Sequence, residues 1–361
     1  MIKSVYIHVP FCKSICSYCD FCKLFYDKKF VSVYLDALEK EINDFYLGEE
    51  VDTIYVGGGT PSALSPEELD RFFQIIKVIK RATHCEFTFE CNPEDIDDIL
   101  LSKLSHYGVN RISMGVESFN KDNLKFLKRV ADFDDIKKKM DLIKYYGINN
   151  INLDLMYALK GETLEVLKGD VKLFLKLKPE HISTYSLIIE NHTMINNDNV
   201  SYISEDLDAK MYDYICKKLK RKGYIHYEVS NFAVSGYKSR HNLCYWNNEE
   251  YYGFGLGASG YVNGFRYDNI KSLTEYEKGN FHHNESLLSQ KEVMEYELML
   301  GLRKLEGISL EEFYDKYGVN MQDVFPIKPL IREKELIYKN GRVFINPDKI
   351  YVMNEILLKL I

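Results

Sequence analysis

The sequence predicts an α/β protein built around an open, partial TIM-like barrel, with a smaller C-terminal α+β domain of winged-helix type. Three observations support this fold class. The chain has 361 residues, which is too long for one small core and suits one large barrel or two domains. Short β-rich apolar runs alternate with amphipathic helical patterns six times. After about residue 225 this alternation stops.

The alternation defines six consecutive strand–helix units. Such a series implies a parallel sheet with right-handed crossovers, larger than half a Rossmann fold and smaller than a closed eight-stranded barrel. One helix has a clear start, with Ser65 as N-cap, Pro66 at the first helical position and Glu68 completing a capping box. The expected strands are 4–9, 52–58, 85–91, 110–116, 149–156 and 181–187, and the expected helices are 29–47, 65–81, 94–106, 134–146, 162–177 and 205–222.

The last third of the chain has a different pattern. Residues 227–267 are rich in Gly, Tyr and Asn, and we expect loops with short strands there. Residues 289–361 show helical patterns and then LIYKNGRVFIN, whose Asn340-Gly341 pair indicates a hairpin turn. The predicted domains are therefore a barrel (1–225), a connecting segment (226–288) and a C-terminal domain (289–361).

The composition excludes several classes of protein. A net charge of −7 leaves no broad basic face, so we expect no nucleic-acid partner. No apolar run reaches the roughly 18 residues of a membrane span, and the N-terminal MIKSVYIHVPFC lacks the apolar core of a signal peptide. We therefore expect a cytoplasmic protein. Thiols stay reduced in that compartment, so clustered cysteines indicate a metal or catalytic site rather than disulfides.

Polar residues stand where each predicted strand ends. The carboxyl-terminal strand ends of parallel barrels carry the chemistry. One such end alone could be a solvated rim charge, but six in a row facing one mouth indicate a functional site. In strand order, the features are the cysteine loop, GGGTPS (57–62), Glu90, Glu117, Asp154 and the Tyr185-Ser186 pair.

The cysteine loop contains Cys12, Cys16 and Cys19 in the spacing CxxxCxxC. Three thiolates on one short loop can bind three irons of a [4Fe–4S] cube and leave the fourth iron open. An open metal position is typical of a catalytic site, whereas structural zinc normally shows a second pair of cysteines, which is missing here. Cys22 could be a fourth ligand or a spare thiol. The sharp backward turn that a fourth ligand would need favours the spare thiol.

The run Gly57-Gly58-Gly59 leaves the backbone bare. A ligand can approach the main-chain amides of such a run closely. The alternative is a tight turn before Pro61, without a ligand.

The cysteine pattern, with an aromatic residue before the third cysteine, resembles the signature of the radical S-adenosylmethionine (SAM) superfamily. This resemblance implies that the methionine part of SAM chelates the open iron and that reductive cleavage yields a 5′-deoxyadenosyl radical. It also implies a partial (β/α)6 radical SAM barrel, in agreement with the strand count. GGGTP looks like the glycine-rich end of strand two that contacts the cofactor's amino group.

A set of further motifs, in one order and spacing, narrows the family. Together they resemble the oxygen-independent coproporphyrinogen III oxidase-like family and, within it, the haem chaperone branch known as HemW. The resemblance is strong over residues 4–262 and weak beyond them. Its motifs are YIHVPFC, CSYCDF, YVGGGTPS, ECNPE, NRISMGVESF, NLDLMY, YEVSNFA, SRHNLCYW and GFGLGASG.

Two features favour the chaperone branch over the oxidase. The oxidase carries a long segment before the cysteine loop and a CxC cysteine, whereas here five residues precede Tyr6 and Phe21 occupies the CxC position. The second feature is HNLCYW (241–246), which is similar to the HNxxYW motif that the branch uses to bind haem.

The motif has a physical interpretation. A neutral imidazole such as that of His241 is a standard axial ligand of haem iron, and Tyr245 and Trp246 would supply a flat apolar wall. The alternative is that His241 is a hydrogen-bonded polar residue in a loop. The family resemblance favours the haem ligand.

The resemblance implies specific roles for individual residues. Cys12, Cys16 and Cys19 would ligate the cluster. Arg129 suits a carboxylate through its forked guanidinium, and Asp154 suits ribose hydroxyls or the amine of SAM. Both lie at the family's offsets from Glu117. The residues implied to line or contact the SAM site are Tyr6, Tyr18, Gly58, Gly59, Thr60, Glu90, Glu117, Arg129 and Asp154.

Three positions depart from the family pattern or remain ambiguous. Glu117 stands where the family has Gln, so the amide donors are lost. Lys160 replaces the Pro of LPGQT, which reads LKGET here. Cys244 could be a second iron ligand, but a variable position is the preferred interpretation. The first two changes bear on cofactor affinity rather than on the fold.

Two functions remain open at this stage. The first is a haem chaperone that takes up haem and passes it to apoproteins, such as membrane-associated respiratory enzymes, with the cluster and SAM supporting conformation, dimerisation or transfer. The second is a radical enzyme, an oxygen-independent coproporphyrinogen III oxidase, in which the cofactor does the chemistry and the barrel positions the substrate. The short N-terminus and His241 favour the first.

Overall fold

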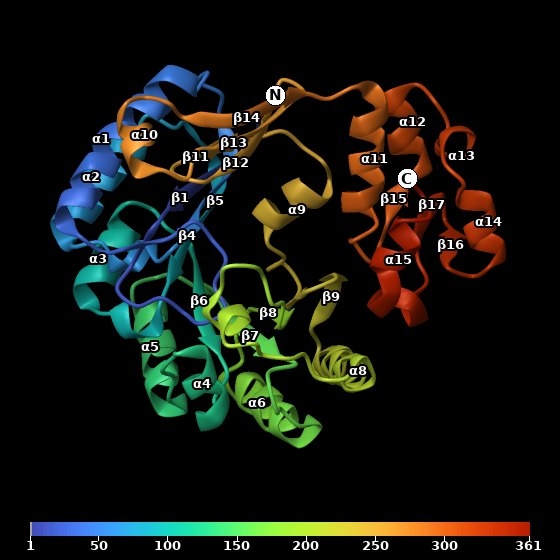
Figure 1. Cartoon of the computed structure of the whole chain (residues 1–361), viewed down its shortest axis with the longest axis horizontal. Helices are drawn as coiled ribbons and strands as arrows, with labels where there is room; N and C mark the ends of the chain where they lie inside the picture. Colours follow the sequence, from blue (N-terminus) through green and yellow to red (C-terminus); the bar gives the residue numbers. More distant parts are fainter. Residues whose placement is uncertain (1) are drawn as a thin grey trace.

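The computed structural model of the protein describes residues 2–361 (Figure 1). Among these residues, twelve strands form one mixed sheet in the order β14-β13-β12-β11-β1-β4-β5-β6-β7-β8-β10-β9. The central strands, from β1 through β4 to β8, pair in parallel, as a series of strand–helix units requires. The strands at the two ends of this order, β14 and β9, are not paired with each other within the described chain, so the barrel is open. The predicted fold class is confirmed.

The barrel strands follow the predicted runs, except that β5 begins at Arg81 rather than at residue 85. Arg81 pairs with Val51 of the neighbouring strand, which lengthens β5 at its start. The barrel strands are β1 (Ser4–Val9), β4 (Val51–Gly58), β5 (Arg81–Cys91), β6 (Arg111–Glu117), β7 (Asn150–Tyr157) and β8 (His181–Ser186), and a short parallel pair, β2 (Phe11–Cys12) and β3 (Leu24–Phe25), flanks the cysteine loop.

The capping box at Ser65 and Glu68 is present, with each side chain accepting from the other's backbone N–H. The helix that it starts ends at Ile76 rather than at residue 81, because the following residues turn into β5. The barrel helices are α1 (Lys28–Phe45), α2 (Pro66–Ile76), α3 (Asp98–His106), α4 (Lys121–Leu127), α5 (Phe133–Tyr145), α6 (Leu164–Leu177), α7 (Met194–Asn197) and α8 (Glu205–Arg221), with 3-10 turns η1 (Pro61–Ala63) and η2 (Pro93–Asp95).

The barrel core forms because the strands and the helices each present an apolar face to one another. In β1, for example, Val5, Ile7 and Val9 are fully buried, and α2 buries Leu69, Phe72 and Phe73 at helical spacing. Truncation of a buried phenylalanine such as Phe72 typically costs about 3–5 kcal/mol. The core therefore holds the strand ends in fixed positions around the mouth of the barrel.

Residues 225–287 add strands to the same sheet. β11 pairs in parallel with β1, and β12, β13 and β14 continue antiparallel. The Gly- and Asn-rich pattern predicted short strands but not their place beside β1, because strand pairing depends on residues far away in sequence. The division of the chain at 225 and 288 stays a prediction. This region comprises β9 (Ile225–Glu228), β10 (Asn231–Ala233), α9 (Arg240–Trp246), β11 (Tyr251–Phe254), β12 (Ser259–Val262), β13 (Phe265–Asn269), α10 (Leu273–Glu277) and β14 (His282–Leu287).

The C-terminal part has its own apolar core and a small sheet. Asn340 and Gly341 both have positive φ, 53° and 73°, which matches a two-residue hairpin turn. Figure 1 shows this part (orange to red) beside the barrel, with α9 between them. It comprises α11 (Gln290–Gly301), β15 (Ile308–Ser309), α12 (Leu310–Tyr317), α13 (Met321–Val324), α14 (Ile327–Arg332), β16 (Leu336–Lys339), β17 (Arg342–Ile345), η3 (Pro347–Val352) and α15 (Met353–Leu357).

Within residues 2–361, none of the helices combines the length and the apolar character that a membrane crossing requires.

Candidate functional site

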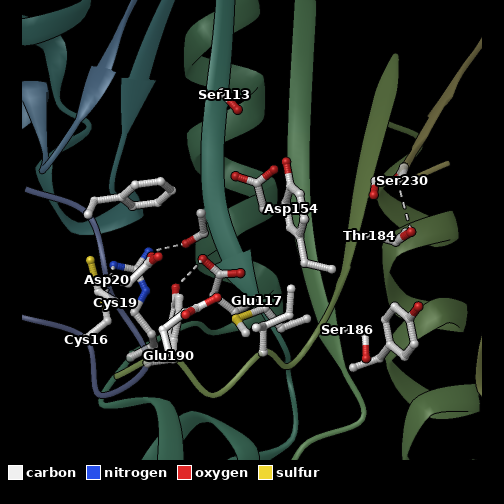
Figure 2. A pocket seen from close by; sticks show the side chains of 18 of the residues that line it. Cys16, Cys19, Asp20, Ser113, Glu117, Asp154, Thr184, Ser186, Glu190 and Ser230 are labelled. Atoms are coloured by element: carbon white, nitrogen blue, oxygen red, sulfur yellow. Dashed lines mark hydrogen bonds between the residues drawn. The ribbon is translucent and has the colours of Figure 1, made fainter. Parts of the chain in front are cut away.

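A cavity of about 600 Å³ opens at the carboxyl-terminal ends of the barrel strands. Figure 2 shows Glu117 and Asp154, from neighbouring strands, near Cys16 and Cys19 of the cysteine loop, and all four line the cavity. Two predicted residues, Tyr6 and His241, do not line this cavity. The predicted residues that do are Cys12, Cys16, Tyr18, Cys19, Gly58, Gly59, Thr60, Glu90, Glu117, Arg129 and Asp154.

The three cysteines of the CxxxCxxC pattern lie at one end of the cavity. The Thr60 hydroxyl donates to Sγ of Cys12 at 3.5 Å, and Nη1 of Arg129 lies 3.9 Å from Sγ of Cys16. Burial raises the pKa of the Cys12 thiol to about 11, so metal binding must displace its proton. Across the described residues, no three His, Cys, Asp or Glu side chains converge as ligands of a single metal ion.

The fourth cysteine of the loop points elsewhere. Cys22 does not line the cavity and packs against the barrel core. Its Cβ would lie 2.5 Å from a Cβ placed on Gly257, so these two residues are in close contact. Three thiols at the mouth and one outside it fit a cluster with one open iron. The cluster ligands themselves stay a prediction.

The glycine run packs more tightly than the sequence suggested. A Cβ on Gly58 would lie 2.7 Å from the ring of His8, and a Cβ on Gly59 would lie 2.6 Å from Pro10. Gly58 also has φ of +113°, a conformation that favours glycine. These glycines are therefore required by the protein's own packing, and both still line the cavity.

The acidic residues of the cavity are buried and hydrogen-bonded. Glu90 accepts from the Tyr55 hydroxyl at 2.7 Å and from the Gly58 N–H at 3.1 Å. Glu117 accepts from the Tyr18 hydroxyl at 3.0 Å. Burial raises the pKa of both Glu90 and Glu117 to about 7, because a carboxylate in this cavity loses most of its hydration.

Arg129 is a positively charged residue that lines the cavity beside these carboxylates. Its Nη1 donates to Asn92 at 2.7 Å, and its Nη2 donates to the carbonyl of Gly115. The guanidinium thus stands between the cysteine loop and Glu117, where it favours negatively charged groups of a ligand. Asn92, in the motif ECNPE, is a positioning residue whose role the sequence did not indicate.

Tyr6 lies beneath the cavity rather than in its wall. Its hydroxyl lies 2.9 Å from Nδ1 of His8, whose Nε2 is 2.7 Å from the carbonyl oxygen of Cys22. Burial lowers the pKa of His8 to about 4, so this ring is neutral at neutral pH. Tyr6 and His8 therefore hold the end of the cysteine loop against β1.

Part of the far side of the cavity comes from elements that the sequence did not connect with the site. Arg303, two residues after α11, and Tyr351, in η3, line the cavity. They lie more than a hundred residues from the barrel strands, and no motif marks them. The strand-end pair Tyr185 and Ser186 lines the cavity, as the sequence predicted. The remaining lining residues on this side include Thr184, Asp208, Tyr212, Ser230, Ile350, Met353 and Asn354.

His241 is at the opposite end of the barrel. It lies 2.8 Å from Thr53, near the start of β4, whereas the cavity is lined by Gly58 at the end of that strand. The five residues from Thr53 to Gly58 span about 16 Å of extended strand. The ring is 1% exposed, and burial lowers its pKa to about 3, so it is neutral. The structure therefore does not bring His241 to the site of the cysteines.

The other residues of HNLCYW are also packed. Cys244 is 3% exposed, and the indole of Trp246 lies 5.8 Å from the Arg303 guanidinium. Arg303 is thus a contact between the HNLCYW helix, α9, and the wall of the cavity.

Family comparisons agree with this architecture. The model of the Radical SAM superfamily matches residues 6–174, and that of the HemN C-terminal domain matches residues 288–348. The chain is 40% identical to "Heme chaperone HemW" of Lactococcus lactis, over 99% of this chain and 97% of that protein. It is also 40% identical to "Heme chaperone HemW" of Bacillus subtilis, over 94% of this chain and 93% of that protein.

Among solved structures, coproporphyrinogen III oxidase (HemN) from Escherichia coli, described as a radical SAM enzyme, superposes with a TM-score of 0.87. The match covers 99% of this chain and 89% of that chain at 20% identity, so the likeness concerns the fold.

Proposed function

Because the chain belongs to the family of the haem chaperone HemW, within the radical SAM superfamily, we propose that it binds haem and delivers it to acceptor proteins. The observation that carries this proposal is the full-length similarity to proteins named as haem chaperones. It includes the HNLCYW segment and the C-terminal part, and not the radical SAM region alone.

The radical SAM region implies a [4Fe–4S] cluster and SAM. Cys12, Cys16 and Cys19 would hold the cluster, since their thiols line one end of the cavity. When bound, the cluster supplies electrons to the cofactor. The residues proposed to hold SAM are Tyr18, Gly58, Gly59, Thr60, Glu90, Glu117, Arg129 and Asp154, which line the cavity, and Tyr6, which supports its floor.

His241 is the proposed axial ligand of haem. Its imidazole is neutral at neutral pH, as iron ligation requires. Tyr245 and Trp246 follow it on the same short helix and could flank a porphyrin face. Cys244 lies on the buried side of this helix, and we assign it no role in binding iron.

The second candidate function is oxidative decarboxylation of coproporphyrinogen III. The similarity of fold to the Escherichia coli oxidase favours it, as does a cavity in which carboxylates face three thiols. Phe21 stands where the oxidase would have a second cysteine of its CxC, which favours the chaperone.

One experiment separates the two. The cluster is reconstituted without oxygen, and haem binding is followed by the Soret band in wild type, His241→Ala and His283→Ala, the last an exposed histidine of β14. Turnover of coproporphyrinogen III with SAM is measured beside it. We expect haem binding that is lost in His241→Ala and kept in His283→Ala, without porphyrin turnover. Turnover in the absence of haem binding would overturn the chaperone proposal. Unchanged binding and spectrum in His241→Ala would overturn the ligand assignment alone.

The proposal extends to partners and compartment. We propose that the acceptors are haem apoproteins, including membrane-associated respiratory enzymes, that the chain acts in the cytoplasm without nucleic acid, and that it forms a homodimer. Sedimentation with and without the cluster tests the last point. A single monomeric species under both conditions would contradict it.

A further inference from the structure

Polar contacts hold the HNLCYW helix, α9, against the end of the barrel where the strands begin, which we call the barrel floor. The backbone N–H groups of Arg240 and His241 donate to the buried carboxylate of Glu86 at 3.1 and 3.0 Å. The ring of Tyr55 in β4 packs against the imidazole ring of His241, with 5.2 Å between the two ring centroids. The helix thus approaches the barrel with its first turn and with the ring of His241.

Both ring nitrogens of His241 are occupied. Nδ1 lies 2.8 Å from the Thr53 hydroxyl, and Nε2 lies 2.8 Å from the Tyr245 hydroxyl. Because Thr53 donates its own proton to Ser4 at 2.9 Å, Nδ1 carries the proton and donates to Thr53. Nε2 is then the acceptor, and its lone pair accepts a hydrogen bond from the Tyr245 hydroxyl.

A haem iron needs that lone pair and space beside it. With α9 against the barrel floor, the Nε2 lone pair accepts the hydrogen bond from Tyr245, and His241 is 1% exposed. We propose that α9 is a latch: Thr53 and Tyr245 hold His241 in a closed position, and haem uptake requires α9 to leave the barrel floor. This inference rests on the proposed function, in which His241 is the haem ligand.

The short length and the contacts of α9 favour its detachment from the barrel floor. It has seven residues, too few for a helix that is stable by itself, so its contacts hold it in place. Its fully buried side chains are the imidazole and Cys244, and not a broad apolar stripe. Hydrogen bonds to the barrel can be exchanged for water at a small net cost. In addition, the Trp246 Nε1 is buried without a hydrogen-bond partner among residues 2–361, so the closed state leaves a donor unsatisfied.

Cys244 is a native reporter of this opening. It is 3% exposed and faces the barrel, so a thiol reagent reaches it when α9 moves away. Cys216, on α8, packs against the barrel core, does not line the cavity and serves as the internal control. The cluster-reconstituted chain is treated with iodoacetamide without oxygen, and alkylation of each cysteine is followed by mass spectrometry. Haem association is measured by stopped flow on the same samples.

Two variants weaken the latch without removing the ligand. Thr53→Val keeps the shape of the side chain and removes the acceptor for Nδ1, and Tyr245→Phe removes the hydroxyl that donates a hydrogen bond to Nε2. Each should speed alkylation of Cys244 about fivefold, equivalent to about 1 kcal/mol, and should speed haem association, with alkylation of Cys216 unchanged. The matched control is Tyr224→Phe, which loses a buried phenol hydrogen bond to the carbonyl of Pro179, a residue outside α9.

Several outcomes decide the proposal. It is supported if bound haem exposes Cys244 and if either variant gives the two accelerations while Tyr224→Phe does not. It is overturned if Cys244 stays as protected with haem as without it, or if both folded variants behave as wild type. Retention of haem by His241→Ala would instead refute the ligand assignment of the proposed function, whatever the accessibility of Cys244.

Discussion

Sγ of Cys16 lies 3.9 Å from Nη1 of Arg129, a residue 113 positions further along the chain. The cysteine loop and the segment after α4 therefore meet at the mouth of the barrel. The guanidinium places positive charge where thiolates and the carboxylate of a bound cofactor would gather. This contact connects the two halves of the proposed cofactor site.

The first prediction concerns the cluster ligands. Cys12→Ser, Cys16→Ser and Cys19→Ser should each lose most of the iron and sulfide of the reconstituted protein, because each removes one of three thiolates. Cys22→Ser should keep them, because Cys22 does not line the cavity. Iron and acid-labile sulfide per chain are the measurements. Equal loss in Cys22→Ser would show that the site is closed by four cysteines.

The second prediction concerns SAM affinity. Asp154→Asn should weaken binding about ten- to hundredfold, since hydrogen bonds to a charged acceptor contribute about 1.5–3 kcal/mol. Titration calorimetry on the cluster-loaded protein measures the change. Asp208→Asn is the matched control, because it alters a carboxylate on the far side of the same cavity. A similar loss in both variants would contradict a specific role for Asp154.

The third prediction is a pH dependence from Glu117. Burial raises the pKa of this carboxyl from 4.5 to about 7, with Arg129 opposing the shift and Asp154 adding to it. Between these values the folded chain holds a proton that the unfolded chain has released, so this group lowers stability as pH rises through that window. Glu117→Gln should remove the effect and should stabilise the cofactor-free chain at pH 8 by up to about 3 kcal/mol.

At pH 5 the same variant should differ little from wild type, because the wild-type carboxyl is then largely neutral in the folded chain. Urea unfolding at the two pH values measures both differences. An equal difference at pH 5 and pH 8 would show that Glu117 is not the source.

The fourth prediction tests a local feature of the fold. Ser65→Ala removes the N-cap of α2 and should lower the free energy of unfolding by about 1 kcal/mol. Ser102→Ala, at an exposed position inside α3, should be neutral or slightly stabilising, because alanine has the higher helix propensity. Equilibrium unfolding of the two variants provides the comparison, and equal effects would argue against the cap.

Much of the barrel could be predicted because its strands and helices are specified by residues close together in the sequence. Strands such as 4–9 are short runs rich in β-branched and apolar residues, and the start of α2 is encoded in Ser65, Pro66 and Glu68. The cysteine spacing and the strand-end carboxylates followed from the same reasoning, since parallel strands point their carboxyl ends to one mouth. The addition of β11–β14 beside β1 could not be predicted, because pairing partners lie far apart in sequence.

The sequence by itself determined the six strand–helix units, the three-cysteine pattern and the family. The tertiary structure decided which of the marked residues share a site. Cys16 and Arg129 meet because the barrel brings the ends of its strands together. His241, in contrast, packs under the barrel with both ring nitrogens occupied, since α9 lies against the starts of the strands. A motif specifies the chemistry that a side chain can perform, whereas packing decides whether its lone pair is free.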